Sequence, residues 1–488
     1  MKTERTARAP RLRPLAACVA MALALGSTLA LGDAHDTHGT FARTFEARTA
    51  LRNGARDLLA GQSHFMQRAR DVHAPAGPTP TVVENCADDG PGSLRQAYRN
   101  AASNETIDLS QLTCSTITLT SGALEDSPTT ENVMLQGPGK YLLTIDGGNA
   151  DRVIVHNGPG SLLIGGVTIQ NGSYTGPNGG GCIYSHANVE LFDVLVTGCT
   201  KNATGTDNAF GGGVYADGRA YVRGSQILDN HVHSDGGNAA GGGVWGNAVA
   251  SQSSTISGNS ANTGDGSHYA RGGGLFSVTD TEISYSTISG NVAGAGGGIF
   301  LVGGAVYPME VLDSTISGNS ASGAGGGVYA KYRQFAVSNS TITQNSAGAQ
   351  GGGMFLTYAT DLDSTIVANN SAADGATADI GSTYDIVLEG SNNLVLASNV
   401  PLPPDTLSVD PMLGPLQDNG GASMTHALLP GSPAIDHGSN PSNGLFEQRL
   451  FDLNGEVFYE RLVGPAPDIG AFEFGAPDRL LIDGFEER

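Results

Sequence analysis

Residues 314–329 read Ser-Thr-Ile-Ser-Gly-Asn-Ser-Ala-Ser-Gly-Ala-Gly-Gly-Gly-Val-Tyr. Both parts of this phrase, the Ser-Thr-Ile run ending in Asn and the glycine run ending in an aromatic residue, recur every 24 to 32 residues. The seven glycine phrases are Gly180–Tyr184, Gly211–Tyr215, Gly241–Trp245, Gly272–Phe276, Gly296–Phe300, Gly325–Tyr329 and Gly351–Phe355. Their partners centre on Val196, Ile227, Ile256, Ile288, Ile316, Ile342 and Ile366. So short a unit cannot bury a core alone, so the copies must stack as a solenoid.

The alternation of side chains along a strand predicts which residues of each copy face the core. The residue two positions before the central aliphatic residue shares its inward face. The residue one position before it faces outward. Three positions after it, where the chain must turn, Asn tolerates left-handed backbone geometry and its amide can bond along the stack. The inward residues are Val194, Ser225, Ser254, Ser286, Ser314, Ser340 and Ser364, and the asparagines are Asn230, Asn259, Asn291, Asn319, Asn345 and Asn369.

Composition and charge limit the class of protein. The 488 residues include 71 glycines and only 15% charged residues, which is typical of a turn-rich β protein. Acidic residues outnumber basic ones by 47 to 25, for a net charge of −22, so nucleic acid and anionic membranes are poor partners. Beyond the first 32 residues no apolar run approaches the length of a transmembrane span.

The chain divides into four segments. Residues 1–32 carry basic residues, an apolar stretch and Ala30-Leu31-Gly32, as expected for a secretory signal peptide. Residues 33–80 are interpreted as a partly helical leader and linker, residues 81–400 as the solenoid, and residues 401–488 as an irregular C-terminal segment and tail. Ser93 predicts the N-cap of a short helix that covers the open end of the solenoid.

Four cysteines follow the signal peptide, namely Cys86, Cys114, Cys182 and Cys199. In an oxidising compartment they predict two disulfide bonds, and three pairings are open from sequence. Proximity favours Cys86 with Cys114 and Cys182 with Cys199; the competing interpretation leaves Cys182 and Cys199 as free core thiols.

The glycine and Ser-Thr-Ile phrases resemble secreted right-handed parallel β-helix proteins and the passenger repeats of polymorphic outer membrane proteins. Gly90–Ala97 resembles the opening segment of CSLREA-type surface proteins, although Gly92 and Gln96 stand where that motif has Cys and Glu. Asp410–Leu416, Gly431–Asp436 and Pro467–Glu473 are similar to the C-terminal segment of choice-of-anchor Q proteins. The resemblance implies an all-β, right-handed parallel β-helix of the pectin lyase-like kind, secreted or on the outer cell surface of a Gram-negative bacterium.

Enzymes with this fold cleave polysaccharides, and their chemistry can be sought in the sequence. The Asn-Thr-Asp, Asp-Asp and Gly-His-Gly phrases of polygalacturonases, which supply paired carboxyl groups, do not occur here. Pectate lyases hold Ca²⁺ on clustered oxygens beside an arginine base. Asp313, Asn339 and Asp363 are weak candidates for such a site, because they stack outward in consecutive copies, but no arginine shares their column. The competing interpretation is a row of surface polar residues, and no cofactor other than Ca²⁺ is suggested.

Three adjacent copies have long segments before the glycine run, and stacking predicts that these form one projecting group of loops. This group is the first candidate ligand-binding site; a tolerated glycine-rich insertion is the competing interpretation. Its candidate residues are Asp207, His231, His233, Asp235, Asp265, His268, Tyr269 and Arg271.

A second candidate is the column of aromatic residues that ends the glycine phrases. Alternation points these rings outward, where they can stack on sugars, or else pack beneath neighbouring loops. The column consists of Tyr184, Tyr215, Trp245, Phe276, Phe300, Tyr329 and Phe355.

Export, repeats and the missing catalytic phrases favour adhesion or passive glycan binding. A polysaccharide lyase or hydrolase with an unrecognised site is the second hypothesis. The third is binding to ice or another crystal lattice through the hydroxyl rows that run from Thr255-Ile256-Ser257 to Thr341-Ile342-Thr343.

Overall fold

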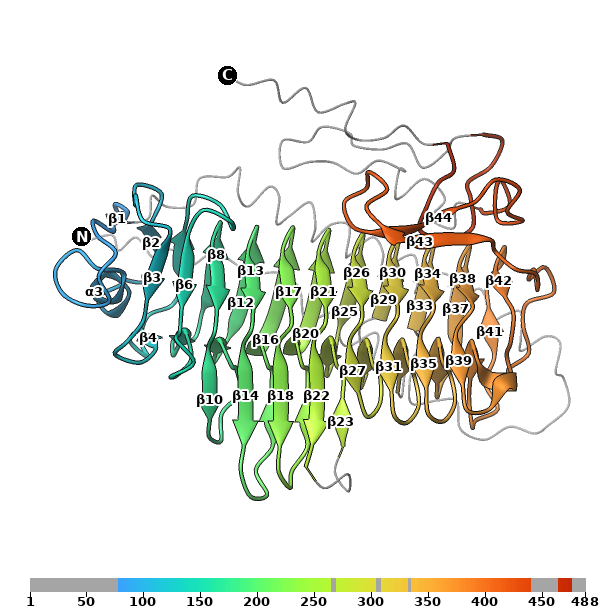
Figure 1. The fold of residues 1–488 in the computed structure, drawn as a ribbon, viewed down its shortest axis with the longest axis horizontal. Coiled ribbons are helices and arrows are strands. Elements are labelled where there is room, and N and C mark those ends of the chain that lie inside the picture. The colour runs from blue at the N-terminus through green and yellow to red at the C-terminus, as the bar shows by residue number, and fades with distance from the viewer. Residues whose placement is uncertain (1–77, 265–268, 304–308, 332–334, 440–463, 476–488) are drawn as a thin grey trace, which may run out of the picture. The chain divides into compact units, whose positions relative to one another are not determined.

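The computed structural model describes residues 78–264, 269–303, 309–331, 335–439 and 464–475. Here the chain winds into a parallel β-solenoid (Figure 1), which confirms the predicted fold class. The only helical elements in these ranges are α3 (Leu94–Arg99) and the 3₁₀ turn η1 (Gly375–Thr377). The predicted signal peptide, and all but the last three residues of the predicted leader, lie outside the described ranges.

Three rows of parallel strands run the length of the solenoid. The first row holds the aliphatic and aromatic residues of the glycine phrases: β4 (Leu124–Glu125), β7 (Ile154–His156), β11 (Ile183–Ser185), β16 (Val214–Arg223), β20 (Val244–Gln252), β24 (Leu275–Ser277), β28 (Ile299–Leu301), β32 (Val328–Ala330), β36 (Met354–Leu356) and β40 (Ile380–Gly381). The second shares β16 and β20, which are long enough to span both rows, and adds β1 (Thr81–Val82), β2 (Glu105–Asp108), β5 (Val133–Gln136), β8 (Ser161–Gly165), β12 (Asn188–Phe192), β25 (Thr281–Ser284), β29 (Met309–Leu312), β33 (Phe335–Ser338), β37 (Thr360–Asp363) and β41 (Leu388–Glu389). The third row holds the Ser-Thr-Ile phrases: β3 (Thr116–Thr118), β6 (Thr144–Asp146), β9 (Thr168–Gln170), β13 (Leu195–Thr197), β17 (Gln226–Leu228), β21 (Thr255–Ser257), β26 (Thr287–Ser289), β30 (Thr315–Ser317), β34 (Thr341–Thr343), β38 (Ile366–Ala368) and β42 (Leu394–Val395).

A fourth row follows the asparagine of each copy. It contains β10 (Ser173–Thr175), β14 (Thr200–Ala203), β18 (His231–Ser234), β22 (Ser260–Thr263), β27 (Val292–Ala293), β31 (Ser320–Ala321), β35 (Ser346–Ala347) and β39 (Ser371–Ala372). After these four rows comes a short separate sheet, here called the fifth sheet, which accompanies only three turns. Its strands are β15 (Ala209–Phe210), β19 (Ala239–Ala240) and β23 (Ala270–Arg271).

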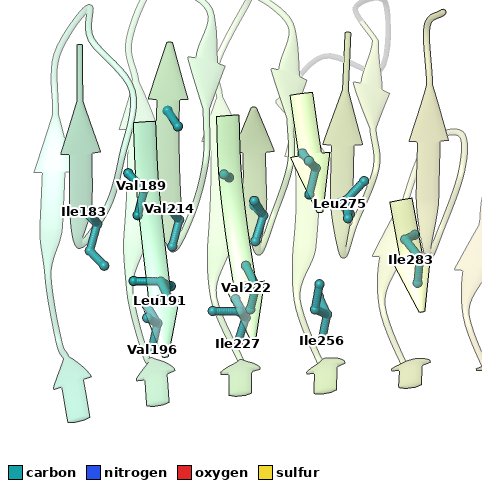
Figure 2. Packing of buried hydrophobic residues seen from close by; sticks show 14 of the residues in the cluster. Ile183, Val189, Leu191, Val196, Val214, Val222, Ile227, Ile256, Leu275 and Ile283 are labelled. Carbon is teal, nitrogen blue, oxygen red and sulfur yellow. The ribbon is translucent and has the colours of Figure 1, made fainter. Parts of the chain in front are cut away.

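Aliphatic side chains from the three long rows fill the interior (Figure 2). They alternate with outward residues, and each stacks on another aliphatic side chain in the next turn, as Val196, Ile227 and Ile256 do. Each such column buries its side chains completely, which supplies the main driving force for stacking.

A column of buried asparagines bonds the turns together at the corner after the third row. The Nδ2 group of Asn319 donates to Oδ1 of Asn345 in the next turn (2.9 Å) and to the carbonyl of Ile288 in the preceding one (2.9 Å). The backbone N–H of Asn319 also donates to Oδ1 of Asn345. The predicted bonding along the stack is therefore confirmed. The left-handed residue, however, is the one before each asparagine, such as Gly318 (φ 65°), because the asparagine itself must turn its amide inward.

The repeat slips by one residue in its last copy. Ile342 pairs with Val367, not Ile366, so Thr365 and Asn370 continue the serine and asparagine columns in place of Ser364 and Asn369. Asp379 then ends the asparagine column, because its Oδ1 accepts from both the backbone N–H and the Nδ2 group of Asn370. In the serine column, each hydroxyl accepts from the backbone N–H of the column residue one turn earlier, as when Ser286 N–H donates to Ser314 Oγ.

Helix α3 lies at the N-terminal end, with Ser93 as its N-cap as predicted. Leu94 and Tyr98 of this helix are buried in the same core as the first turns. The Cys86–Cys114 and Cys182–Cys199 disulfides are both present, with Cα separations of 6.4 and 5.4 Å. The pairing favoured by proximity is thus confirmed.

The C-terminal segment covers the outward face of the third row from β26 to β38. Its hairpin, β43 (Leu413–Gln417) and β44 (Thr425–Leu428), crosses these strands (Figure 1). Thr287 Oγ1 donates to the Met424 carbonyl, Ser317 Oγ lies 2.8 Å from His426 Nε2, and Thr341 Oγ1 accepts from Ala471 N–H. The hydroxyl array proposed for lattice binding is therefore buried over most of its length, which removes the basis of that hypothesis.

We expect Asn319→Ala to destabilise the protein by about 2–4 kcal/mol, because it leaves buried donors and acceptors in two neighbouring turns without partners. The midpoint of thermal unfolding tests this. Asn262→Ala, at an exposed position on β22, is the matched control and should change the midpoint little. Equal effects of the two substitutions would contradict the ladder as a main source of stability.

We expect acid to loosen the C-terminal segment through His426. Its Nδ1–H donates to the Gly414 carbonyl (2.7 Å), so the neutral ring accepts from Ser317 through Nε2. Burial lowers the pKa of His426 below its ordinary value. Because the folded protein then binds fewer protons than the unfolded chain, stability falls as pH decreases from about 6.5 through the folded pKa. Limited proteolysis at pH 5 and 7.5 should show faster cleavage of this segment at pH 5, and His426→Gln should weaken that difference.

Candidate functional site

A lateral lobe widens the solenoid in three turns. We define it as residues 200–210, 231–240, 260–264 and 269–271, which contain β14, β18 and β22 of the fourth row and β15, β19 and β23 of the fifth sheet. Small side chains fill the space between the two sheets, namely Ala203, Ala209, Val232, Ala239, Ala261 and Ala293. The segments predicted as projecting loops are thus largely strands around a small core of their own.

Histidines lie on the outer face of the lobe. His231 and His233 alternate with buried Val232 on β18, so both face outward, with ring centroids 6.2 Å apart. His231 Nδ1 lies 2.7 Å from Ser260 Oγ, and His233 Nε2 lies 3.3 Å from Asp235 Oδ1. Burial lowers the pKa of His231, and His233 lowers it further, so the neutral ring is favoured. This face offers hydrogen-bonding groups to a ligand.

An aromatic and a cationic group meet at the C-terminal end of the fifth sheet. Tyr269 is 62% exposed, and the Arg271 guanidinium lies 4.0 Å from its ring centroid and 5.1 Å from that of Phe300. Asp207 is exposed at the tip of the first lobe turn. The structure therefore separates the predicted residues into a histidine face and a Tyr269–Arg271 end, while Asp265 and His268 fall outside the described residues.

Two buried cations close the N-terminal end of the lobe. The Arg152 guanidinium lies 3.3 Å from the ring centroid of Tyr174, and Lys201 Nζ lies 5.3 Å from the same centroid. Lys201 is fully buried, and its ammonium donates to the carbonyls of Gly176 and Asn202. Burial lowers the pKa of Lys201 to about 8, with a further contribution from Arg152. Both cations therefore lie near the ring of Tyr174 on β10, which pairs with the first strand of the lobe, a contact that the sequence did not reveal.

The aromatic column stacks upon itself. Successive rings from Tyr184 to Phe300 are nearly parallel, and Tyr215 and Trp245 lie 4.5 Å apart at 11°. Phe276 and Phe300 are buried under Ala240, with Phe210 and Ala295 packed alongside. Because each ring covers the face of its neighbour, the column presents edges and not faces, which is poor geometry for stacking on sugars.

A cluster of polar groups lies along the exposed edge of this column. This cluster was not predicted from the sequence. His186 Nδ1 lies 3.1 Å from the Tyr184 hydroxyl and 3.3 Å from Asp217 Oδ2, and the Tyr215 hydroxyl donates to Asp217 Oδ1 (2.6 Å). Burial, together with Asp217, raises the pKa of Tyr215 well above its ordinary value. The signal was available, since His186 and Asp217 each stand two residues after an aromatic residue of the column in adjacent turns.

The predicted stack of Asp313, Asn339 and Asp363 is not formed. Asp313 and Asn339 are equivalent left-handed corner residues, but Ser364 takes that place in the next turn, and Asp363 instead lies on β37 opposite Ser338. The one-residue slip of the last copy is the cause. Within the described ranges, no three His, Cys, Asp or Glu side chains are grouped so as to hold a metal ion.

Asp126, His156 and Ser185 follow one another in adjacent turns and superficially suggest a hydrolase triad. His156 Nδ1 bonds Asp126 Oδ2 at 2.5 Å, and both side chains are fully buried. His156 Nε2 faces the Gly160 carbonyl, and Ser185 Oγ donates to the Asn188 carbonyl. A buried set with these partners fixes a corner of the backbone and presents no nucleophile to a substrate.

Comparison with models of known protein families finds no match. No curated protein matches the chain either. The fold class therefore stands on the structure itself, as a parallel β-solenoid of 11 turns counted along its third row. No helix within the described ranges is long and apolar enough to cross a membrane, and the two disulfides fit an extracellular protein.

We expect Lys201→Met to stabilise the protein by roughly 1–3 kcal/mol at pH 7, since it removes a charge whose pKa folding lowers from 10.5 to about 8. The Asn202 carbonyl still accepts from Gly176 N–H after the substitution, and Gly176 is half-exposed. The penalty is complete below pH 8 and disappears as pH rises to 10.5, so the advantage of the variant should shrink over that interval. Urea unfolding at pH 7, 9 and 10.5 measures it, and a constant difference would show that the lysine charge is not responsible.

Proposed function

We propose that the protein is an exported β-helix protein that binds a glycan of a cell surface or extracellular matrix without cleaving it. The observation that carries this proposal is the lateral lobe, where an otherwise regular solenoid widens in three adjacent turns. Solenoids commonly place recognition on such irregularities, because the repeating turns only hold them in position.

The two parts of the lobe supply complementary contacts. Tyr269 offers an exposed ring, and the Arg271 guanidinium lies 4.0 Å from the centroid of that ring. The histidine face offers two imidazoles at half-exposed positions and the exposed carboxylate of Asp235. These groups bind by hydrogen bonds and stacking, and the predicted signal peptide and the two disulfides support an extracellular setting.

Glycan binding should depend on the lobe. On an array of uronic-acid and neutral glycans, with and without Ca²⁺, we expect Tyr269→Ala to weaken binding of the recognised glycan about tenfold, equivalent to about 1.4 kcal/mol. Tyr141→Ala is the matched control, because Tyr141 is 69% exposed and lies outside the lobe. Binding unchanged by Tyr269→Ala would contradict the lobe as the site, and reproducible glycan turnover would contradict passive binding.

A further inference from the structure

Two exposed tyrosines lie in the connections that follow the first row in consecutive turns, far along the chain from the lobe. Phe355 of β36 pairs with Gly381 of β40, and Tyr358 and Tyr384 each follow three residues later. Tyr358 is 55% exposed and Tyr384 59%, and neighbouring Val387 is 55% exposed. We call these three side chains the tyrosine patch.

The backbone beneath the patch is held by side-chain hydroxyls. Thr360 Oγ1 donates to the Tyr358 carbonyl (3.2 Å). Ser382 Oγ accepts from Tyr384 N–H (2.9 Å) and donates to the Tyr384 carbonyl (3.1 Å). Thr360 N–H donates to the Val387 carbonyl, which ties the two connections together. A ligand therefore meets rings whose backbone positions are already fixed, which reduces the entropy lost on binding.

The patch differs from the aromatic column in what its rings present. Rings of the column cover one another's faces at separations of 4.5 to 6.3 Å. Of the aromatic side chains that the structure describes, none stacks on Tyr358 or Tyr384, and more than half of each residue is open to solvent. Their faces are therefore available where those of the column are not.

We propose that the tyrosine patch is a contact site for a neutral glycan. Tyrosine suits this role because its face packs against the apolar C–H face of a pyranose while its hydroxyl remains hydrated. The paired strands that precede the two tyrosines are neighbours in the first row, about 4.8 Å apart. The connection after β40 then holds two more residues before the next pair, Thr360 with Leu388. An extended glycan that runs along the solenoid axis can contact both tyrosines.

Charge and size limit the class of ligand that can bind the tyrosine patch. Asp385, next to Tyr384, is exposed, and the chain carries a net charge of −22, so a polyuronate is repelled. A stable protein interface needs about 800 Å² from each partner, or some 20 residues, and three exposed side chains are too few to anchor one. The patch does not depend on the lobe, so the two sites can be tested separately.

The test uses the full-length protein and three hexasaccharide probes, namely cellohexaose, chitohexaose and hexagalacturonate. Isothermal titration calorimetry should show binding of at least one neutral probe, with a Kd that the double variant Tyr358→Ala/Tyr384→Ala raises about tenfold or more. The double variant Tyr358→Phe/Tyr384→Phe keeps both ring faces and should bind nearly as well as the wild type. Unchanged thermal unfolding midpoints establish that the variants are folded.

The controls separate this proposal from binding at the lobe. Tyr141→Ala should leave the Kd unchanged. If only Tyr269→Ala weakens binding of the neutral probes, the lobe is the site and the patch proposal is wrong. The proposal is equally overturned if no neutral probe binds, if hexagalacturonate is preferred, or if the alanine double variant only converts an oligomer to a monomer, which would make the patch a contact between copies of the chain.

Discussion

From Asn230 to Asn370 the turns of the solenoid bend at a buried corner, and the asparagine column satisfies the backbone groups that this bend turns away from water. Each amide in the column bonds both the turn before and the turn after it, as Asn319 does with Ile288 and Asn345. The bonds between side chains of the column all point the same way along the axis, from Asn230 to the carboxylate of Asp379. This corner repeats in register with the aliphatic columns, and an apolar side chain there leaves buried donors unpaired.

Much of this architecture could be predicted, because it is written in short-range periodicity. The inward aliphatic columns, the asparagine ladder, the capping helix and the disulfide pairing each depend on residues whose spacing is visible in the sequence. The register predicted for the last copy was wrong, because Ser364-Thr365-Ile366-Val367 contains two adjacent aliphatic residues. Only the pairing of Ile342 with Val367 in the structure decides between them. The C-terminal cover could not be foreseen, since it joins residues such as Thr287 and Met424, whose relation depends on tertiary packing alone.

The candidate sites could be predicted only in part from the sequence. Sequence identified the lobe by its length but not its strands, because alternation in Thr200–Ala203 and His231–Ser234 is too short to be read without the neighbouring turn. It identified the aromatic column but not the stacking of its rings, which follows from the strand spacing and makes the column a structural feature. The tyrosine patch escaped notice because Tyr358 and Tyr384 lie in the connections between strands, outside the repeated phrases.

The C-terminal segment also changes how the turns of the solenoid hold together. In a simple repeat each turn depends on its two neighbours, so the ends fray first and unfolding spreads one turn at a time. Here a single segment is bonded to Thr287, Ser317, Thr341 and Ser364, which belong to four successive turns. A pull or a thermal fluctuation at that end must release all four together, so these four turns behave as one mechanical block.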